Sequence, residues 1–233
     1  MGEEQFVTIT LPSKGLAYED PSTGTIQVRP FKGRDEALLA ELTLDNAKKK
    51  FVTIIKNVIK GIDPEKLTSG DVQYILLWQA INSYNRDYPI QLVCEHCLKN
   101  IQVVCDLSKI NSVELSDDFV QPIVVKLSNR TVQLRLLTLN DEISEFDWSV
   151  QGKSTYFYLY ALSIVDEKMD LLAKLSMLED MSPSDLNVIR ETLKKYDHGP
   201  DMITPYICPL CEYEGKIELP FRYEKLFSFS KQP

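Results

Sequence analysis

Several patterns that mark common enzymes are missing from the sequence. Glycine is scarce, at 9 of 233 residues, and neither G-x-x-x-x-G-K-[ST] nor G-x-G-x-x-G occurs, so a phosphate-cradling loop is not expected. The chain has two histidines, His96 and His198, and no H-E-x-x-H motif. No serine or cysteine stands in a nucleophilic setting with either histidine, so the machinery for acyl transfer is not visible. We therefore expect a protein that is not an enzyme.

Features of secreted and membrane proteins are also missing. The first ten residues lack a basic start and an apolar segment of signal-peptide length. No apolar run reaches the roughly 18 residues of a membrane span, and residues 156–165 come nearest. The net charge of −8 disfavours generic binding to nucleic acid, because an acidic surface repels phosphates. We expect neither a membrane nor a nucleic acid as a partner.

The sequence does contain five cysteines, four of which form two C-x-x-C pairs. Residues 93–105 read V-C-E-H-C-L-K-N-I-Q-V-V-C, and residues 207–219 read I-C-P-L-C-E-Y-E-G-K-I-E-L. Without a secretory signal, such pairs indicate a metal rather than disulfides. Four thiolates match the closed tetrahedral set of a structural zinc site. The sequence therefore predicts a structural Zn²⁺ ion bound by Cys94, Cys97, Cys208 and Cys211.

Other chemistries of the two C-x-x-C pairs stay open. C-P-L-C resembles a rubredoxin knuckle, which would hold iron, but neither pair is followed by the glycine of that pattern. Thiol redox chemistry is a second alternative. His96 lies inside the first pair and is a possible ligand, yet Leu210 occupies the matching position in the second pair. We expect His96 to be a loop residue, and the sequence alone does not decide between zinc and iron.

The pairs are separated by 111 residues, whereas a compact zinc ribbon separates its pairs by about 15–20. An internal repeat explains the distance. Residues 25–37 (T-I-Q-V-R-P-F-K-G-R-D-E-A) and 131–143 (T-V-Q-L-R-L-L-T-L-N-D-E-I) share Thr, Gln, Arg, Asp and Glu at an offset of 106. An alternating apolar run precedes each, at 6–11 and 122–127. We infer two copies of one module, each with a hairpin, helices, a C-x-x-C knuckle and a strand.

The predicted fold is therefore α+β, with two tandem pseudo-repeats joined by a shared Cys₄ zinc ribbon. The first module covers residues 1–107, a linker covers 108–119, and the second module covers 120–233. Each module would supply one knuckle, and the knuckles would meet across a pseudo-twofold axis. Cys105 and Leu219 each lie eight residues after the last cysteine of a pair. We therefore expect Cys105 to pack in the core rather than to bind metal.

Helical spacing of apolar residues predicts helices at 34–42, 47–60, 71–84, 154–165, 169–178 and 183–196, and a further helix is expected to begin at Asp141-Glu142. Ser182 followed by Pro183 is typical of a capped helix start. His198 stands beside a helix-stopping Gly-Pro, where we expect at most a capping cation. The pairs Asp35-Glu36 and Asp141-Glu142 begin helices, where the helix dipole favours acidic residues. Paired catalytic carboxylates are the alternative for these four residues.

Residues 154–165 are apolar on nearly every face. A helix of this kind is buried or forms an interface. Aromatic residues commonly anchor protein interfaces. Core packing and a partner-binding face are both open for Tyr156, Phe157, Tyr158 and Tyr160.

Three short stretches resemble proteins of tailed-phage tails: L-P-S-K-G-L-A-Y at 11–18, V-R-P-F-K-G-R-D-E-A-L-L at 28–39 and P-I-Q-L-V-C-E-H-C at 89–97. The chain looks most like the T4-type baseplate hub subunit and hub assembly chaperone family. The resemblance implies a non-enzymatic role in building the baseplate hub, as a chaperone for hub and tape-measure proteins or as a retained subunit. It implies hub or tape-measure proteins as partners, with self-association possible. The host cytoplasm during assembly and the virion baseplate are the implied locations.

The alternative function is a zinc-ribbon adaptor in transcription or nucleic-acid handling. Its support is a local polar and basic patch formed by Lys99, Asn100, Arg222 and Lys225. The net charge weighs against this function. An enzyme would need an open metal site, whereas four cysteine ligands close the coordination sphere.

Overall fold

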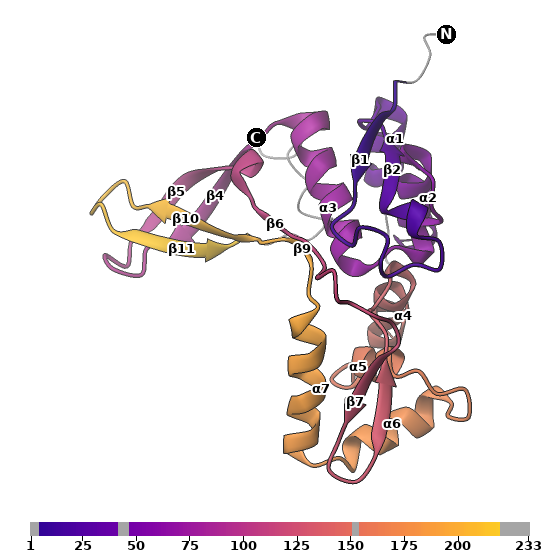
Figure 1. Ribbon diagram of the computed structural model, residues 1–233. Helices are drawn as coiled ribbons and strands as arrows, with labels where there is room; N and C mark the ends of the chain where they lie inside the picture. Colours follow the sequence, from indigo (N-terminus) through magenta and orange to yellow (C-terminus); the bar gives the residue numbers. More distant parts are fainter. Residues whose placement is uncertain (1–4, 42–46, 151–153, 220–233) are drawn as a thin grey trace.

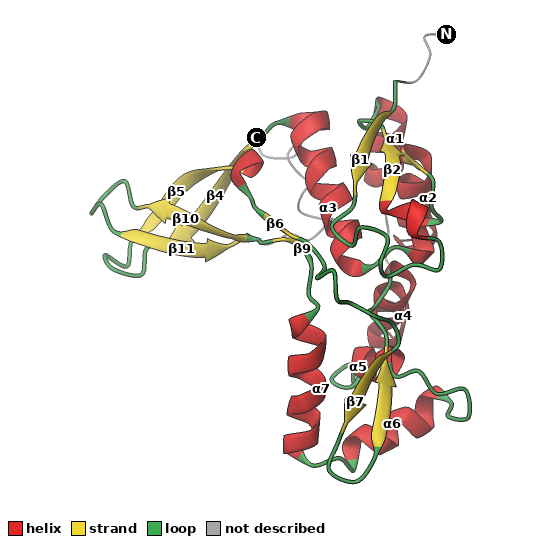
Figure 2. Cartoon of the chain, in the orientation of Figure 1, coloured by secondary structure: helices red, strands yellow, loops and turns green. Residues whose placement is uncertain are grey.

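The computed structural model describes residues 5–41, 47–150 and 154–219, which form two lobes and an arm that projects from their junction (Figure 1). The fold is a mixed α/β arrangement with small antiparallel sheets of two or three strands. Each lobe combines a hairpin with helices, whereas the arm consists of strands and turns (Figure 2). At this coarse level the predicted mixture of helices and small hairpins is confirmed.

The first lobe begins with the antiparallel hairpin of β1 (Val7–Thr10) and β2 (Thr25–Val28). Three helices follow: α1 (Gly33–Ala40), α2 (Ala47–Val58) and α3 (Ser69–Gln79). The apolar residues of α2 recur at helical spacing and are buried: Phe51, Ile54, Ile55 and Val58. The expected helix at 47–60 ends two residues early, because β3 (Ile59–Lys60) pairs with β2 instead.

The third helix also ends before the predicted limit of residue 84. The α-helical part stops at Gln79, and Ala80–Tyr84 form a π-helical turn. Within this turn, Ser83 Oγ donates to Gln79 Oε1 at 2.8 Å. Both oxygens accept from the backbone N–H of Phe31, at 2.9 and 3.1 Å. The wider turn therefore fastens the end of α3 to the segment that leads into α1.

The second lobe has a hairpin of β7 (Ile123–Lys126) and β8 (Thr131–Leu134). Four helices follow: α4 (Leu139–Val150), α5 (Tyr158–Ser163), α6 (Leu171–Glu179) and α7 (Pro183–Lys195). Ser182 caps α7 as predicted, since its Oγ accepts from the backbone N–H of Asp185 at 3.1 Å. The expected helix at 154–165 shortens to α5, because Ile164 forms a bridge to Leu134 of β8 and continues as extended chain.

The arm consists of two antiparallel hairpins. The first joins β4 (Asp87–Val93) to β5 (Asn100–Asp106), and the second joins β10 (Ile203–Ile207) to β11 (Glu214–Glu218). Val93 lies opposite Asn100 in one hairpin, and Ile207 lies opposite Glu214 in the other. At the base of the arm, the short strands β6 (Ser112–Val113) and β9 (Gly199–Pro200) pair with each other. Both hairpins therefore leave the body of the protein at one place (Figure 1).

Buried apolar side chains gather in two clusters. The first cluster covers the β1–β2 hairpin, α2, α3, the inner faces of both arm hairpins, and Leu139 and Ile143 of α4. The second cluster lies in the second lobe and includes Leu134, Ile164, Leu178 and Ile189. Tyr206, in the last hairpin, and Leu219, directly after it, belong to the first cluster. The module boundaries at 1–107, 108–119 and 120–233 stay a prediction, and the chain crosses between the clusters more than once.

The loop between β1 and β2 connects the two lobes. Asp71, on α3, is fully buried, and its carboxylate accepts from Ser13 N and Tyr18 Oη of this loop. Leu16 packs against the second cluster. In the expected linker, Leu115 is buried and donates its N–H to the carbonyl of Pro12 at 2.9 Å. Residues 11–18 therefore contact both lobes and lie between them.

The N-termini of α3 and α4 meet at the junction of the lobes. Ser69 N donates to Leu137 O at 3.1 Å, and Leu139 N donates to Leu67 O at 2.9 Å. His198, expected to be at most a capping cation, is buried here. Its Nε2 lies 2.7 Å from Thr68 Oγ1, and its Nδ1 lies 3.1 Å from the carbonyl of Tyr196. The histidine therefore hydrogen-bonds two segments that are distant in the sequence, α3 and the end of α7.

Each lobe also repeats one ion pair between its hairpin and the next helix. Arg29 binds Asp35 with Nη–Oδ distances of 2.7 and 3.2 Å, and Arg135 binds Asp141 at 2.6 and 2.8 Å. In each pair the aspartate also accepts from a backbone N–H three residues earlier, at 2.9 and 2.8 Å. The helix dipole alone, as inferred from sequence, is thus an incomplete account of these aspartates.

The first expected outcome concerns the close approach of α3 to the chain after α7. A Cβ added to Gly70 would lie 2.1 Å from the carbonyl oxygen of His198. Gly70→Ala is therefore expected to destabilise the fold by about 1–3 kcal/mol through overpacking, although alanine ordinarily favours a helix. Urea unfolding measures the difference. Gly33→Ala is the control, because its Cβ meets nothing within 4 Å; equal stability of the two variants would contradict the described packing.

The second expected outcome compares the two ion pairs. Arg29 and Asp35 are both buried, whereas the side chain of Arg135 is 30% exposed. Asp35→Asn removes a bidentate carboxylate from a buried guanidinium and is expected to cost about 3–5 kcal/mol. Asp141→Asn is expected to cost less, because water reaches Arg135. Thermal unfolding of both variants tests the order, and a larger loss for Asp141→Asn would contradict it.

The pH dependence of stability provides an independent readout. Burial opposes ionisation of Asp35, but hydrogen bonds from Arg29 and the Lys32 backbone outweigh it and hold its pKa below the usual value. The stability that Asp35 contributes is present above about pH 4 and is lost as the pH falls through the lowered pKa. The wild type is therefore expected to lose stability in acid more steeply than Asp35→Asn.

Candidate metal centre

Two knuckle turns at the end of the arm position the four cysteines. In the first turn, Cys94 N donates to Lys99 O at 3.0 Å and Leu98 N donates to Cys94 O at 2.9 Å. In the second turn, the same two hydrogen bonds run from Cys208 N to Tyr213 O at 2.8 Å and from Glu212 N to Cys208 O at 2.9 Å. The residue after each pair has a left-handed backbone, with φ of 57° at Leu98 and 58° at Glu212. The two knuckles therefore have the same backbone conformation and the same pattern of hydrogen bonds.

The sulfurs of the four predicted ligands lie together. The distance is 3.8 Å between the sulfurs of Cys94 and Cys211, and 3.9 Å between those of Cys97 and Cys208. All four sulfurs lie within 4.8 Å of one another. Tetrahedral ligands at about 2.3 Å from a zinc ion would be about 3.8 Å apart. The geometry of the side chains therefore fits a single four-coordinate metal ion.

The arrangement has the symmetry that a pair of equivalent knuckles would produce. The first cysteine of each knuckle contacts the second cysteine of the other, so exchanging the knuckles converts one contact into the other. Cys94 and Cys208 are fully buried, and Cys97 and Cys211 are half-buried. The cysteines at equivalent positions of the two knuckles are therefore also buried to the same extent.

Electrostatics of the cluster favour a bound cation. The backbone N–H of Cys97 and that of His96 favour the thiolate of Cys94, whose pKa falls to about 6. At Cys211 the N–H of Tyr213 acts in the same direction, but burial and hydrogen bonds with the other sulfurs outweigh it and raise the pKa to about 12. Four thiolates this close repel one another strongly. A divalent cation removes this repulsion and allows all four to ionise.

Residues around the cluster hold the knuckles against each other. The ring of His96 stacks on that of Tyr213, with centroids 5.6 Å apart and an angle of 13°. Tyr213 Oη also donates to the carboxylate of Glu95 at 3.4 Å. His96 is exposed and does not join the sulfur group, as expected of a loop residue. Cys105 is buried in the first cluster, like Leu219, and burial raises its pKa.

The donor set determines what the centre can do. In the described part of the chain, the potential ligands within 4.8 Å of one another are the four sulfurs, without a histidine or carboxylate. A closed set of four protein ligands leaves no position for water or substrate, which is the property of a structural site. The arrangement can therefore fasten the two hairpins together, and it offers no coordination position for catalysis.

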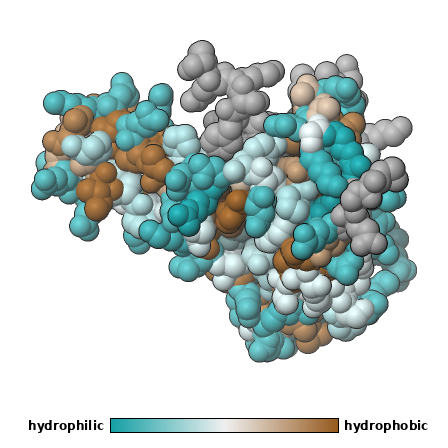
Figure 3. Space-filling model, turned by 90° about the horizontal axis from the view of Figure 1, so that it is seen from above, coloured by the Kyte–Doolittle hydropathy of each residue, from teal (hydrophilic) through white to brown (hydrophobic). Residues whose placement is uncertain are grey.

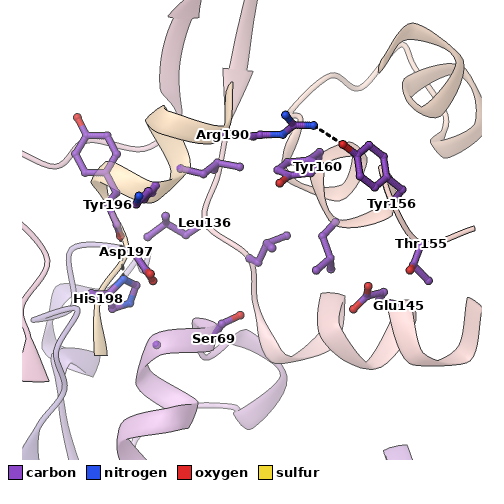
Figure 4. A pocket seen from close by; sticks show the side chains of 15 residues that line it. Ser69, Leu136, Glu145, Thr155, Tyr156, Tyr160, Arg190, Tyr196, Asp197 and His198 are labelled. Atoms are coloured by element: carbon purple, nitrogen blue, oxygen red, sulfur yellow. Dashed lines mark hydrogen bonds between the residues drawn. The ribbon is translucent and has the colours of Figure 1, made fainter. Parts of the chain in front are cut away.

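Two of the four predicted partner-binding aromatic residues line a cavity between the lobes (Figure 4). The cavity has a volume of about 450 Å³, and Tyr156 and Tyr160 line it. Tyr156 is 64% exposed, and its Oη accepts from Arg190 at 2.8 Å. Phe157 is half-buried against the second cluster, and Tyr158 is buried, with its ring 4.9 Å from that of Trp148. Their binding to a partner stays a prediction.

Sequence reasoning missed the arginine of each Arg–Asp pair. The signal was present, because Arg29 and Arg135 are among the residues shared by the repeat, each six positions before its aspartate. The basic patch of the alternative function is described only in part. Lys99 and Asn100 are exposed near the knuckles, and Arg222 and Lys225 lie outside the described residues.

The third expected outcome is metal binding by the purified chain. One zinc ion per chain is expected from elemental analysis, and Co²⁺ is expected to replace it with the absorption of a tetrahedral thiolate complex. Cys94→Ser and Cys208→Ser are each expected to lose the metal together with solubility, because both knuckles supply ligands. Cys105→Ser is the control that keeps the metal. One bound metal per chain in either of the first two variants would contradict a shared site.

Comparison with protein families gives one further finding. A family model described as T4 bacteriophage base plate protein matches residues 5–228, which is nearly the whole chain. Comparisons with curated proteins and with solved structures give no match. Within the described ranges, no helix has the length and apolar character needed to cross a membrane. The chain belongs to the T4 bacteriophage base plate protein family.

Proposed function

We propose that the chain is a non-enzymatic assembly protein of the baseplate hub, either a hub subunit or a hub assembly chaperone, and that its four cysteines hold a structural zinc ion. One observation carries the proposal: in a member of the base plate family, two hairpins that are far apart in sequence bring four sulfurs within 4.8 Å. The closed ligand set supports a structural metal, because it leaves no open position for catalysis.

The proposal includes a duplicated module. The strand pairings of the two lobe hairpins correspond: Gln27 lies opposite Thr8, and Gln133 lies opposite Val124. The Arg–Asp pairs, the backbone bonds to each aspartate and the two knuckle turns also correspond, at nearly constant offsets in sequence. These matches support two copies of one unit, with one knuckle from each copy in a shared zinc ribbon.

Zinc would act through stability. The first knuckle precedes the second lobe and the second knuckle follows it, so one ion closes a loop of 111 residues. Closing a long loop removes conformational entropy from the unfolded chain. Because the ligand set exists only in the folded state, the free energy of metal binding adds to that of folding. The ion would therefore fix the arm to a body made of two lobes.

The surfaces of the molecule agree with a role in assembly. The arm projects away from the lobes (Figure 1), and the cavity between the lobes is lined by Tyr156, Tyr160 and Arg190. Aromatic residues and arginine are common at the centres of protein interfaces. The partners on this proposal are other proteins of the baseplate hub or the tape-measure protein, and self-association is a further possibility.

The fourth expected outcome tests the hub assignment. Inactivating the gene during infection is expected to prevent completion of baseplates at their centre, and supplying the chain from a plasmid is expected to restore them. Electron microscopy of lysates counts complete baseplates. Mass spectrometry of purified particles then separates a retained subunit from a chaperone, which would be absent. If baseplates form in normal number without the chain, the proposal is rejected. If, in addition, the purified chain binds DNA at low salt, the nucleic-acid adaptor is the better assignment.

A further inference from the structure

The arm exposes several large apolar side chains. Figure 3 shows apolar residues among hydrophilic ones on the arm, at the left of the view. Six large apolar side chains of the arm are between 54% and 76% exposed: Val93, Leu98, Val104, Ile203, Ile207 and Leu210. Isolated apolar residues are ordinary on protein surfaces, so exposure alone does not identify a binding surface. The backbone of one of them supplies the second observation.

Leu98 combines an unfavourable backbone with an exposed side chain. Its φ of 57° lies in the left-handed region, where a side chain costs conformational free energy and glycine is the natural residue. The side chain is 76% exposed, the largest value among these six. Packing within the described chain therefore does not compensate for the backbone. Glu212 has the same backbone at the equivalent position of the second knuckle, so the distinguishing feature of Leu98 is the exposed apolar side chain that this turn presents, which indicates a role in contact with another molecule.

Charge restricts the chemistry of that molecule. The two arm hairpins, residues 87–106 and 203–218, contain two lysines and six carboxylates, which gives a net charge of −4. Three of the carboxylates belong to the knuckles or follow them directly: Glu95, Glu212 and Glu214. A divalent ion held by four thiolates adds a charge of −2 at the same place. The tip of the arm, defined as residues 95–99 and 209–214, contains these three carboxylates and one lysine, Lys99, and is therefore an apolar projection with a net negative charge.

We propose that the tip of the arm is a docking element that inserts Leu98, supported by Leu210, into an apolar pocket with a basic rim on another baseplate protein. The inference rests on the proposed function, since it assumes a partner within the baseplate. A second copy of the chain is disfavoured, because each copy has a net charge of −8. Nucleic acid and anionic membranes are disfavoured by the same charge.

The metal centre suits this use of the arm. The hydrogen bonds within each knuckle, with the sulfur cluster that includes the neighbouring Cys97, hold the turn in one conformation. A side chain presented on a rigid turn loses little conformational entropy on binding. Few residues dominate most interfaces, and they are commonly apolar or aromatic anchors in desolvated pockets. Complementary charges around such an anchor steer association and exclude wrong partners.

The matched turns provide the experiment. Leu98→Gly and Glu212→Gly relieve the same left-handed backbone at equivalent positions of the two knuckles. Each variant is expected to raise the melting temperature by about 2–4 °C. Purified protein is added in increasing concentration to an extract of cells infected with phage that lack the gene, and complete baseplates are counted. Leu98→Gly is expected to need a concentration about tenfold to hundredfold higher than the wild type, the effect of losing one buried leucine.

Further arms of the experiment separate the possible causes. Glu212→Gly is expected to stay within a few-fold of the wild type, and Leu98→Met is expected to recover most of the loss because its side chain stays apolar. Raising the salt concentration is expected to weaken complementation by the wild type. Sedimentation equilibrium of the wild type and Leu98→Gly reports self-association through the same residue.

Each result has a defined consequence. If Leu98→Gly matches the wild type, or if Glu212→Gly fails equally, docking through Leu98 is overturned while the proposed function stands. If the wild type forms dimers that Leu98→Gly does not form, the occupant is a second copy and the proposal is overturned. If the wild-type protein itself restores no baseplates, the proposed function fails first and the inference fails with it.

Discussion

Four sulfurs within 4.8 Å of one another are the constraint on which the rest of the structure depends. They come from two hairpins whose cysteine pairs are separated by 111 residues, so the chain must return to its first hairpin after building a whole second lobe. The return explains why Tyr206 and Leu219 pack in the first hydrophobic cluster. It also explains the close approach of Gly70 to His198, because the chain passes α3 on its way back.

The parts of the fold that the sequence could predict are those with local or repeated signals. The hairpins, the cap of α7 and the four cysteines each follow from a short pattern, and the burial of Cys105 follows from comparison with Leu219. Helix ends were less predictable: α2 and α5 stop where residues with the same apolar pattern pair with β2 and β8. Tertiary pairing decides such boundaries, and periodicity does not contain it.

Polar contacts between distant segments were the least predictable features. His198 reads as an isolated residue beside Gly-Pro, and its partner Thr68 lies 130 positions away. The Arg–Asp pairs were readable in principle, since the repeat preserves both members at a fixed spacing. The family match covers the lobes and the arm alike, so the baseplate role attaches to the whole architecture and not to one motif. Within that architecture, hydrogen bonds at the junction connect the lobes, and the four cysteines bring the two arm hairpins together.

The order of the two knuckles along the chain also has a consequence in time. During synthesis the hairpin of β4 and β5 leaves the ribosome 111 residues before its mate. At ordinary rates of translation this interval lasts about 5–20 s. Throughout it, Cys94 and Cys97 lack the second pair of cysteines, and the first hydrophobic cluster lacks Tyr206 and Leu219. The newly made chain therefore passes through a stage in which half of the cysteine cluster and part of the first hydrophobic cluster have not yet been synthesised.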